Sequence, residues 1–468
     1  MSKKSKVAIF GLGYIYKQKK ELLKNIEVIA YLDNDKEKQG SYIEGVRVIS
    51  PAEVIQMQVD YIVLMSIYHT EMRQQLLELG IENHKIISYD NLNFFEYCVK
   101  KNANKYEEEY KKYLRSDKKN ILLLSNEMTL TGAVIVLYYL ALLLKKNGYN
   151  PMVIAPEKGE LEKYYTEEGI PVFYEKHIRS YNVELVGFMN ECDLILINTI
   201  ILSDIIFAVR NVETPFIWWI HESGKRCETV NNPQLVEVFS DNLHIYGVGK
   251  CALNTLHSIW ENVQVKNLLY GLPDVTENIM PVCSGEKVIF ALVGLVYDVK
   301  GQDIFLQAIE QLPEDAMEKA EFWIVGRVIN EPMFDKIKLI IEKYDNVKYL
   351  GELHRKQMQE VYSKIDVLVC PSRRDTMPVV TIEAMMNHRP CIVSDVIGTA
   401  EYIEDGVNGF VCPTEDTLRL AQIMERIIKE PERISDMGDK ARKVFENHFS
   451  MDSFEKEAIK IVRELLEV

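Results

Sequence analysis

The sequence alternates short hydrophobic runs with amphipathic helical patterns, and this alternation starts three separate times along the chain. It begins with "KVAIFG" at residue 6, begins again with "NILLLSNE" at residue 120, and begins a third time with "KVIFALVG" at residue 287. Strands that alternate with helices are typical of parallel sheets covered by helices. We therefore predict an α/β protein built from three such units, of which the first is small.

A charged segment separates the first unit from the second. Residues 100–118 are dense in charge and nearly free of large aliphatic side chains, which is typical of a solvated helix or linker. We predict a small Rossmann-like domain at 1–99, this linker, a second unit at 119–275 and a third unit at 276–468. The final helix, in "MDSFEKEAIKIVRELLEV", is expected to pack across or beside the second and third units.

Composition excludes several classes of protein. The formal net charge of -15 argues against a general nucleic-acid binder, because such proteins usually carry a basic excess. The eight cysteines form no C-x-x-C pair, which favours reduced thiols over disulfides or a zinc site. The longest apolar run, "AVIVLYYLALLL", is well below the ~20 residues that span a bilayer. We expect no signal peptide and a cytoplasmic protein, and we leave open a position at the inner face of the cell membrane.

Two carboxylates, Asp375 and Glu383, lie eight positions apart in "PSRRDTMPVVTIEAM", and Pro378 stands between them. Because proline is tolerated in the first turn of a helix but not in its interior, we predict a helix from about 378 to Met386. Asp375 then lies on a loop after a strand, at the sheet edge where α/β proteins bind ligands. Carboxylates accept hydrogen bonds from sugar hydroxyls, and helix-start amides bind phosphate. The alternative is that both residues are structural: Asp375 would lie in a turn, and Glu383 would interact favourably with the helix dipole near its N-terminus.

The segment "CPSRRDTMPVVTIEAMMNHRPCIVSDVIGTAEYIEDGVNGFVCP" closely resembles the signature region of family 4 glycosyltransferases, which have the GT-B fold. The matching positions are Pro371, Ser372, Pro378, Glu383, Ala384, Met385, Pro390, Ser394, Gly398, Glu401, Gly406 and Gly409. The segments "TLTGAVIVLYYLALLLKKNGYNPMVIAP", "FIWWIHE" and "ALVGLVYDVKGQDIFLQAIEQL" are also similar to the family, in the expected order. The resemblance covers residues 119–468 and implies two Rossmann-like domains that face a cleft.

The resemblance implies a role for each site residue. Glu383 would bind the nucleotide ribose, Asp375 the donor sugar hydroxyls, and Lys300 would neutralise the diphosphate as it leaves. His221 would lie between donor and acceptor, and Gly132 would let the backbone approach the ligand. Each of these residues also has an ordinary explanation. Lys300 would be a surface lysine, His221 a structural histidine, and Gly132 a glycine at the start of a helix. The predicted catalytic residues are His221, Lys300 and Asp375. The predicted donor-binding residues are Gly132, Lys300, Asp375, Thr376, Met377, Pro378, Val379 and Glu383.

The sequence departs from the family pattern at two positions. The first acidic residue of the pair is usually glutamate and here is Asp375, which is one methylene shorter. The frequent arginine near the lysine is here Leu295, so one phosphate-binding cation is missing. Arg373, Arg374 and Arg327 are three candidates to replace it, and the sequence does not choose among them.

The first unit offers a weaker site. Gly11 and Gly13 follow a strand, and Asp33 lies twenty residues beyond Gly13, a spacing typical of dinucleotide-binding folds. The third glycine of that pattern is replaced by Tyr16, which obstructs close helix packing. "DND" at 33–35 is better explained as a strand-end acidic cluster than as a metal motif. The segment resembles small Rossmann-like domains that precede sugar-modifying acyltransferases and other envelope-glycan enzymes. Such a domain would bind a nucleotide-type ligand or serve as an assembly surface, and we favour a non-catalytic role.

From the resemblance of residues 119–468 to family 4 glycosyltransferases, we predict a retaining, metal-independent glycosyltransferase that uses no cofactor. It would move a sugar from a UDP-sugar, favoured over a GDP-sugar, to a glycan, lipid-linked or protein acceptor in surface polysaccharide or glycoconjugate synthesis. The main alternative is a catalytically weak GT-B subunit that binds glycan or partners, and a GT-B sugar-nucleotide epimerase fits the motifs less well. We expect no nucleic-acid partner, and we leave open peripheral membrane association and an oligomer formed through the first unit.

Overall fold

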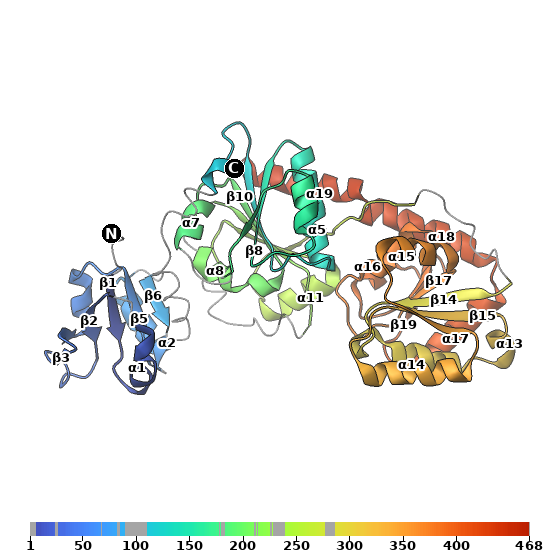
Figure 1. The fold of residues 1–468 in the computed structure, drawn as a ribbon, viewed down its shortest axis with the longest axis horizontal. Helices are drawn as coiled ribbons and strands as arrows, with labels where there is room; N and C mark the ends of the chain where they lie inside the picture. The colour runs from blue at the N-terminus through green and yellow to red at the C-terminus, as the bar shows by residue number, and fades with distance from the viewer. Residues whose placement is uncertain are drawn as a thin grey trace.

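The computed structural model places three separate sheets along the chain (Figure 1). It describes residues 6–467 except 24–26, 67, 82–84, 89–109, 177, 179–182, 210, 211, 213, 225–226, 228–238 and 277–285. The greater part of the predicted linker at 100–118 therefore lies outside the described residues. The predicted boundaries at 99 and 275 also fall on or beside such residues and stay predictions. The parallel sheets confirm the predicted α/β class.

The first sheet has six strands in the order β3-β4-β2-β1-β5-β6, all parallel except for the β3–β4 pair. Its strands are β1 (Lys6–Phe10), β2 (Glu27–Leu32), β3 (Tyr42–Ile43), β4 (Val46–Ile49), β5 (Tyr61–Leu64) and β6 (Ile86–Ser88). The helices are α1 (Tyr14–Lys19), η1 (Lys20–Leu23), η2 (Pro51–Gln56) and α2 (His69–Glu78). Separate apolar clusters cover the two faces of the sheet.

The second sheet has seven parallel strands in the order β13-β12-β11-β10-β7-β8-β9. They are β7 (Asn120–Leu124), β8 (Asn150–Ala155), β9 (Val172–Tyr174), β10 (Leu194–Asn198), β11 (Phe216–Ile220), β12 (Leu243–Gly247) and β13 (Val265–Asn267). The helical segments are η5 (Lys111–Tyr113), α5 (Gly132–Lys146), α6 (Glu162–Glu167), α7 (Val183–Met189), η6 (Ile200–Leu202), α8 (Asp204–Val209) and α11 (Gly249–Ile259). Every residue of β7, β10 and β11 is buried, as expected for a parallel sheet covered on both faces.

The third sheet has six parallel strands in the order β16-β15-β14-β17-β18-β19. They are β14 (Val288–Val293), β15 (Ala320–Val325), β16 (Val347–Gly351), β17 (Val367–Cys370), β18 (Cys391–Ser394) and β19 (Gly409–Cys412). The helical segments are η7 (Asp298–Lys300), α12 (Gln302–Glu310), α13 (Glu314–Met317), α14 (Glu331–Lys343), α15 (Arg355–Lys364), α16 (Val379–Met386), η8 (Gly398–Tyr402), α17 (Thr417–Lys429), α18 (Arg433–Val444) and η9 (Phe445–Phe449). The strand order reverses between β14 and β17, so the loops after these two strands flank the point where such sheets bind ligands.

The last helix, α19 (Met451–Leu466), packs against α5 of the second sheet's layer (Figure 1). The Glu455 carboxylate accepts hydrogen bonds from Lys146 Nζ at 2.6 Å and from Asn147 Nδ2 at 2.8 Å. The Phe454 ring stacks on the Trp219 ring with 5.6 Å between centroids. The chain therefore returns from the third unit to complete the hydrophobic core of the second.

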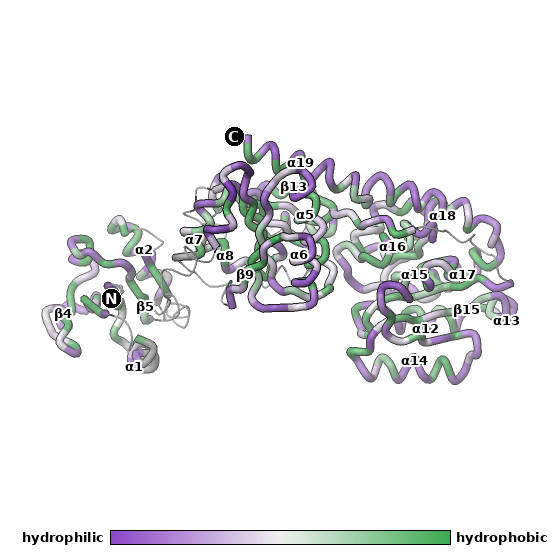
Figure 2. The backbone as a smooth tube through the Cα atoms, turned by 45° about the horizontal axis from the view of Figure 1, so that its top comes forward, coloured by the Kyte–Doolittle hydropathy of each residue, from purple (hydrophilic) through white to green (hydrophobic). Residues whose placement is uncertain are grey.

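Hydrophobic residues fill the buried strands of the sheets. Helices such as α14 and α19 alternate hydrophobic and polar residues (Figure 2). Six of the cysteines lie in the described part of the chain, and all six are free thiols. The other two, Cys98 and Cys283, fall outside it. Within the described residues, the helices are too short or too polar to cross a bilayer.

Candidate active site

The loop that carries Asp375, residues 371–378, is here called the carboxylate loop, and it connects β17 to α16. The helix begins directly after Pro378, as the sequence predicted. Pro378 is the residue before the helix, with backbone angles of -66° and 121°, and α16 runs from Val379 to Met386. The Thr381 hydroxyl donates to the Pro378 carbonyl at 2.7 Å, which satisfies an acceptor at the helix start. This geometry confirms the predicted helix and places Asp375 on the loop before it.

Lys300 and Asp375 form an ion pair at the centre of the candidate site. Lys300 Nζ lies 2.5 Å from Asp375 Oδ2, and the two side chains are only 22% and 19% exposed. Burial acts to lower the pKa of Lys300, but the negative charge of Asp375 raises it above its usual value overall. The lysine is therefore a permanent cation at neutral pH.

A glycine brings the lysine loop against the carboxylate loop. Gly301 adopts φ +71°, and a Cβ atom at this position would lie 2.3 Å from the Pro371 carbonyl oxygen. The backbone N–H of Arg373 donates to the Val299 carbonyl at 2.8 Å, which joins the two loops directly. No residue with a side chain fits this approach, so Gly301 positions Lys300 beside the carboxylate loop.

Glu383 lies one turn into α16 and receives a hydrogen bond from Tyr362. The Tyr362 hydroxyl donates to Glu383 Oε2 at 2.7 Å. Burial raises the pKa of Glu383, although this hydrogen bond and the charge of Arg355 act in the opposite direction. The carboxylate therefore gains from any further donor that reaches it, such as a ligand hydroxyl.

The carboxylate loop also touches the second unit. The Tyr270 hydroxyl donates to the Met377 carbonyl at 2.7 Å, and Ser223 Oγ lies 2.8 Å from Thr376 Oγ1. At the start of α5, a Cβ atom on Gly132 would lie 3.6 Å from Val379 Cγ2. The two Rossmann-like units therefore meet at the predicted donor-binding residues.

Sequence reasoning missed three residues that shape this site. Tyr362 positions Glu383, Tyr270 binds the Met377 carbonyl, and Ser223 meets the Thr376 hydroxyl. The two residues of these three pairs are separated by 21, 107 and 153 positions in the sequence, in that order. No local pattern marks such pairs. The proximity of Ser223 to His221 was the one available hint for it.

His221 follows β11 and is held in an apolar setting. Its ring lies 4.5 Å from the Trp219 ring, measured between centroids, and 6.3 Å from the Tyr270 ring. Its Nε2 atom is buried and has no hydrogen-bond partner among the described residues. Burial lowers the pKa of His221 to about 3, so the ring is neutral at physiological pH. It can offer a hydrogen-bond donor or acceptor but no charge.

This low pKa predicts a pH-dependent stability. As the pH falls below about 6.5, the unfolded chain gains a proton at His221 that the folded chain does not bind until about pH 3. The free energy of unfolding should therefore fall by about 1.4 kcal/mol per pH unit from this residue alone. Urea unfolding between pH 4.5 and 7.5 would show a shallower slope for His221→Gln than for wild type. The exposed His257 supplies the control, His257→Gln, and identical slopes in all three proteins would contradict the prediction.

The predicted residues of the first unit lie at the carboxyl ends of β1 and β2. Gly11 adopts φ +96°, and Gly13 precedes α1. The buried Tyr16 hydroxyl lies 3.1 Å from the Tyr31 hydroxyl, so the tyrosine fills the space left by the missing glycine. Asp33 is buried and already accepts hydrogen bonds from Lys38 Nζ at 3.0 Å and from the backbone of Asp35 at 3.0 Å. A ligand role for Gly11, Gly13 and Asp33 stays a prediction. The described residues hold no cluster of three or more His, Cys, Asp or Glu side chains suited to a metal.

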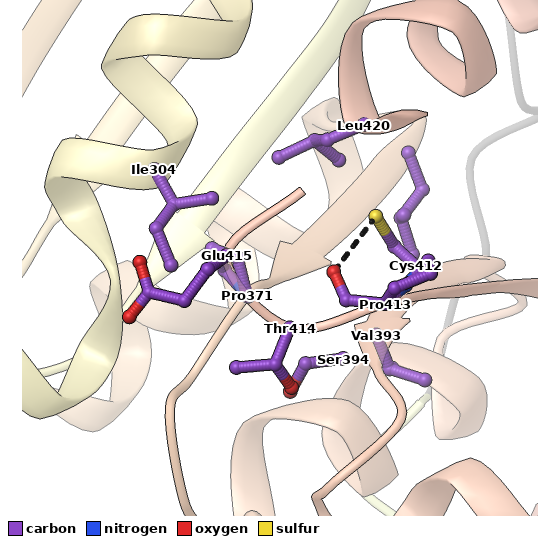
Figure 3. A pocket seen from close by; sticks show the side chains of 10 residues that line it. Ile304, Pro371, Val393, Ser394, Cys412, Pro413, Thr414, Glu415 and Leu420 are labelled. Atoms are coloured by element: carbon purple, nitrogen blue, oxygen red, sulfur yellow. Dashed lines mark hydrogen bonds between the residues drawn. The ribbon is translucent and has the colours of Figure 1, made fainter. Parts of the chain in front are cut away.

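A small cavity lies behind the carboxylate loop, lined in part by Pro371, Ser394, Cys412 and Thr414 (Figure 3). Its volume is about 10 Å³, which suffices for about one water molecule. The cavity is therefore too small for a nucleotide or a sugar.

Three segments of the chain match families of known proteins. Residues 117–238 match the family described as Glycosyl-transferase family 4, and residues 281–444 match Glycosyl transferases group 1. Residues 3–87 match the family described as C2185-like, N-terminal. The first two families correspond to the two units that meet at Thr376 and Met377.

Individual proteins are similar over shorter spans. Alpha-D-kanosaminyltransferase of Streptomyces kanamyceticus is 26% identical over 180 residues, which cover 38% of this chain and 46% of that protein. An uncharacterized 41.2 kDa protein in the cps region of Klebsiella pneumoniae is 31% identical over 140 residues, covering 30% of this chain and 37% of that protein. The chain thus spans less than half the length of these curated relatives.

A solved structure extends the likeness over both units. Anabaena Alr3699/HepE, in complex with UDP and glucose, has a TM-score of 0.62 at 16% identity and covers 73% of this chain and 99% of that chain. At this identity the likeness shows the fold, which is the GT-B arrangement of two Rossmann-like domains. Residues 117–238 and 281–444 therefore belong to glycosyltransferase families of the family 4 type, the two units share the GT-B fold, and a C2185-like domain precedes them.

Proposed function

We propose that the chain is a retaining glycosyltransferase that needs no metal and transfers a sugar from a nucleoside diphosphate donor. The donor is a UDP-sugar in preference to a GDP-sugar, and the acceptor is a glycan, a lipid-linked saccharide or a protein. The largely buried Lys300–Asp375 ion pair, whose Asp375 lies on the loop leading into the helix that carries Glu383, is the observation that carries this proposal. Surface polysaccharide or glycoconjugate synthesis is the proposed setting, and the relative in a cps region supports it.

Lys300 supplies the charge that the reaction needs. When the bond between sugar and diphosphate breaks, negative charge grows on the leaving phosphate, and a fixed cation stabilises it. In the free protein the lysine is balanced by Asp375. A bound donor would share the lysine between phosphate and carboxylate, while the second oxygen of Asp375 accepts a sugar hydroxyl. The arrangement lets one ion pair hold both parts of the donor.

Glu383 is proposed to bind the ribose. Tyr362 engages Oε2, and the remaining lone pairs of the carboxylate can accept ribose hydroxyls. Because burial disfavours the ionised form of Glu383, two additional hydroxyl donors would stabilise it when the nucleotide binds. His221 is neutral and lies two residues before Ser223, which meets the Thr376 hydroxyl, so it would then shape the space between donor and acceptor.

A calorimetric screen with UDP, GDP, ADP and their sugars tests the donor site. We expect one nucleotide to bind, UDP first, and Glu383→Ala to weaken it by about 10- to 100-fold, because hydrogen bonds to a charged group contribute about 1.5–3 kcal/mol. Glu342→Ala, which removes an exposed glutamate from α14 of the same unit, is the matched control. A hydrolysis assay with the sugar form of the bound nucleotide follows. Absence of binding by every nucleotide would overturn the enzyme proposal.

The second candidate is a catalytically weak GT-B subunit that binds glycan or partner proteins. Leu295 favours it, because the chain lacks the arginine that usually accompanies the lysine. Nucleotide binding without hydrolysis or transfer to any acceptor would support this reading over the enzyme. Turnover in the hydrolysis assay would exclude it.

A further inference from the structure

The side chain of Leu295 is exposed at the carboxyl end of β14, in the loop that carries Lys300. An arginine at this position would give the diphosphate a second cation. We propose that Arg327 supplies this cation from the neighbouring strand and binds the diphosphate of the donor and of the product. This inference rests on the proposed function, because it names a further residue of the same donor site.

Strand register places Arg327 directly beside Leu295. In the parallel β14–β15 pair, Val293 is paired with Val325, and beyond the strand ends Val296 is bridged to Val328. The same offset pairs Leu295 with Arg327, and the Val296 N–H donates to the Arg327 carbonyl at 2.9 Å. Paired residues of neighbouring strands point to the same face, and the strands lie about 4.8 Å apart. The long guanidinium side chain spans that distance.

Two glycines, Gly294 and Gly326, allow the loop that carries Arg327 to approach the loop that carries Lys300 closely. Gly326 adopts φ +146°, and a Cβ atom there would lie 1.9 Å from the Gly294 carbonyl oxygen. The stem of Lys300 covers Gly294, at 3.6–3.7 Å from where its Cβ would be. Arg327 and Lys300 therefore rise from adjacent turns at the same edge of the sheet.

The loop after β15 is held in place by its neighbour. The backbone N–H groups of Ile329 and Asn330 both donate to the Val296 carbonyl, at 3.2 and 3.1 Å. The Asn330 side chain also donates to Asp298 at 3.3 Å. A backbone held by these bonds loses little conformational entropy when Arg327 meets a ligand.

The other two arginines are worse placed. Arg373 is held by Asp303 at 2.9 Å and by Glu415 at 2.5 Å, and these two carboxylates raise its pKa. Its charge is already neutralised. Arg374 is exposed and precedes Asp375, which forms a bridge of extended backbone with Ile397. Successive side chains of extended backbone point to opposite sides, so Arg374 points away from the Lys300 side of the loop.

Arg327 is exposed, and among the described residues its guanidinium has no ion-pair or hydrogen-bond partner. Arginine recognises phosphate through two parallel hydrogen bonds, and each exposed donor is available for them. The family's cation has thus moved one strand along the sheet in this chain.

Calorimetry with the matched pairs UDP and UMP, and GDP and GMP, tests the assignment. Arg327→Leu should weaken binding of the diphosphate by about 10- to 100-fold, as expected for a lost charge-assisted hydrogen bond to phosphate. Binding of the monophosphate, which lacks the terminal phosphate, should change by less than about threefold. Arg374→Leu removes the same charge from the same unit and should leave diphosphate affinity within about twofold. The double variant Leu295→Arg/Arg327→Leu should recover most of the affinity.

Each result decides between the alternatives. Equal losses in Arg327→Leu and Arg374→Leu would mean a general effect of net charge and would overturn the assignment. So would an unchanged diphosphate affinity, or an equal loss for the monophosphate with a lowered melting temperature, which indicates damage to the fold. In these three cases wild type still binds a nucleotide and the proposed function stands. If wild type binds none of the four nucleotides, the proposed function and this assignment fall together.

Discussion

Replacing Lys300 with alanine is expected to lower kcat for sugar transfer or donor hydrolysis by about 10²- to 10³-fold, the usual cost of losing one group that stabilises transition-state charge. The reason is geometric: Lys300 is the cation that faces Asp375, and its charge is maintained by that carboxylate. Donor affinity should fall less than kcat, because the charge on the leaving phosphate is largest in the transition state.

The matched control for this variant is Lys348→Ala. Lys348 is also paired with a carboxylate, Glu321, at 2.7 Å, but at the amino ends of β15 and β16, which is the opposite edge of the sheet. Steady-state kinetics with the donor found in the nucleotide screen would compare the two variants. A loss of less than threefold in Lys300→Ala, with the fold intact by thermal melting, would remove Lys300 from the catalytic residues.

The second large effect is expected for Gly398→Ala. A Cβ atom on Gly398 would lie 1.7 Å from the Thr376 carbonyl oxygen, and backbone atoms cannot rotate away as a side chain does. The Gly398 N–H also donates to the Asp375 carbonyl at 3.1 Å, so the added methyl pushes directly on the loop that carries Asp375. We expect a loss of about 3 kcal/mol in stability and a loss of nucleotide affinity together.

Thermal melting and nucleotide calorimetry measure both parts of this prediction. For a domain of this size, 3 kcal/mol corresponds to a fall of about 6–12 °C in Tm. Gly187→Ala in α7 is the control, because nothing lies within 4 Å of its added methyl group and alanine favours helices. A Gly398→Ala protein that melts and binds nucleotide like wild type would show that the carboxylate loop tolerates a shift of its backbone.

Local signals were sufficient to predict much of the fold. The proline at 378 predicted the start of α16. Hydrophobic runs predicted β1, β7 and β14, because strands of covered parallel sheets are apolar throughout. The short strands β3 and β9 carry only two and three residues, too few for a hydrophobic period to be recognised.

The site was predictable only where a single residue type carries the chemistry. Lys300 and Asp375 were identified separately by resemblance, yet their contact depends on Gly301 fitting against Pro371. The occupation of Arg373 by Asp303 and Glu415 joins residues 70 and 42 positions apart. These contacts depend on how segments distant in the sequence pack against one another, and no residue spacing in the sequence predicts them.

The return of α19 to the second unit has a consequence for the order in which the protein can fold during synthesis. Residues 119–275 leave the ribosome long before residues 451–466. In the folded protein, however, α5 and Trp219 are covered by Phe454 and its neighbours on α19. The nascent second unit therefore carries an uncovered apolar face while the third is being translated. Its last layer is added only after almost two hundred further residues have emerged, and until then this apolar face is open to aggregation or to a chaperone.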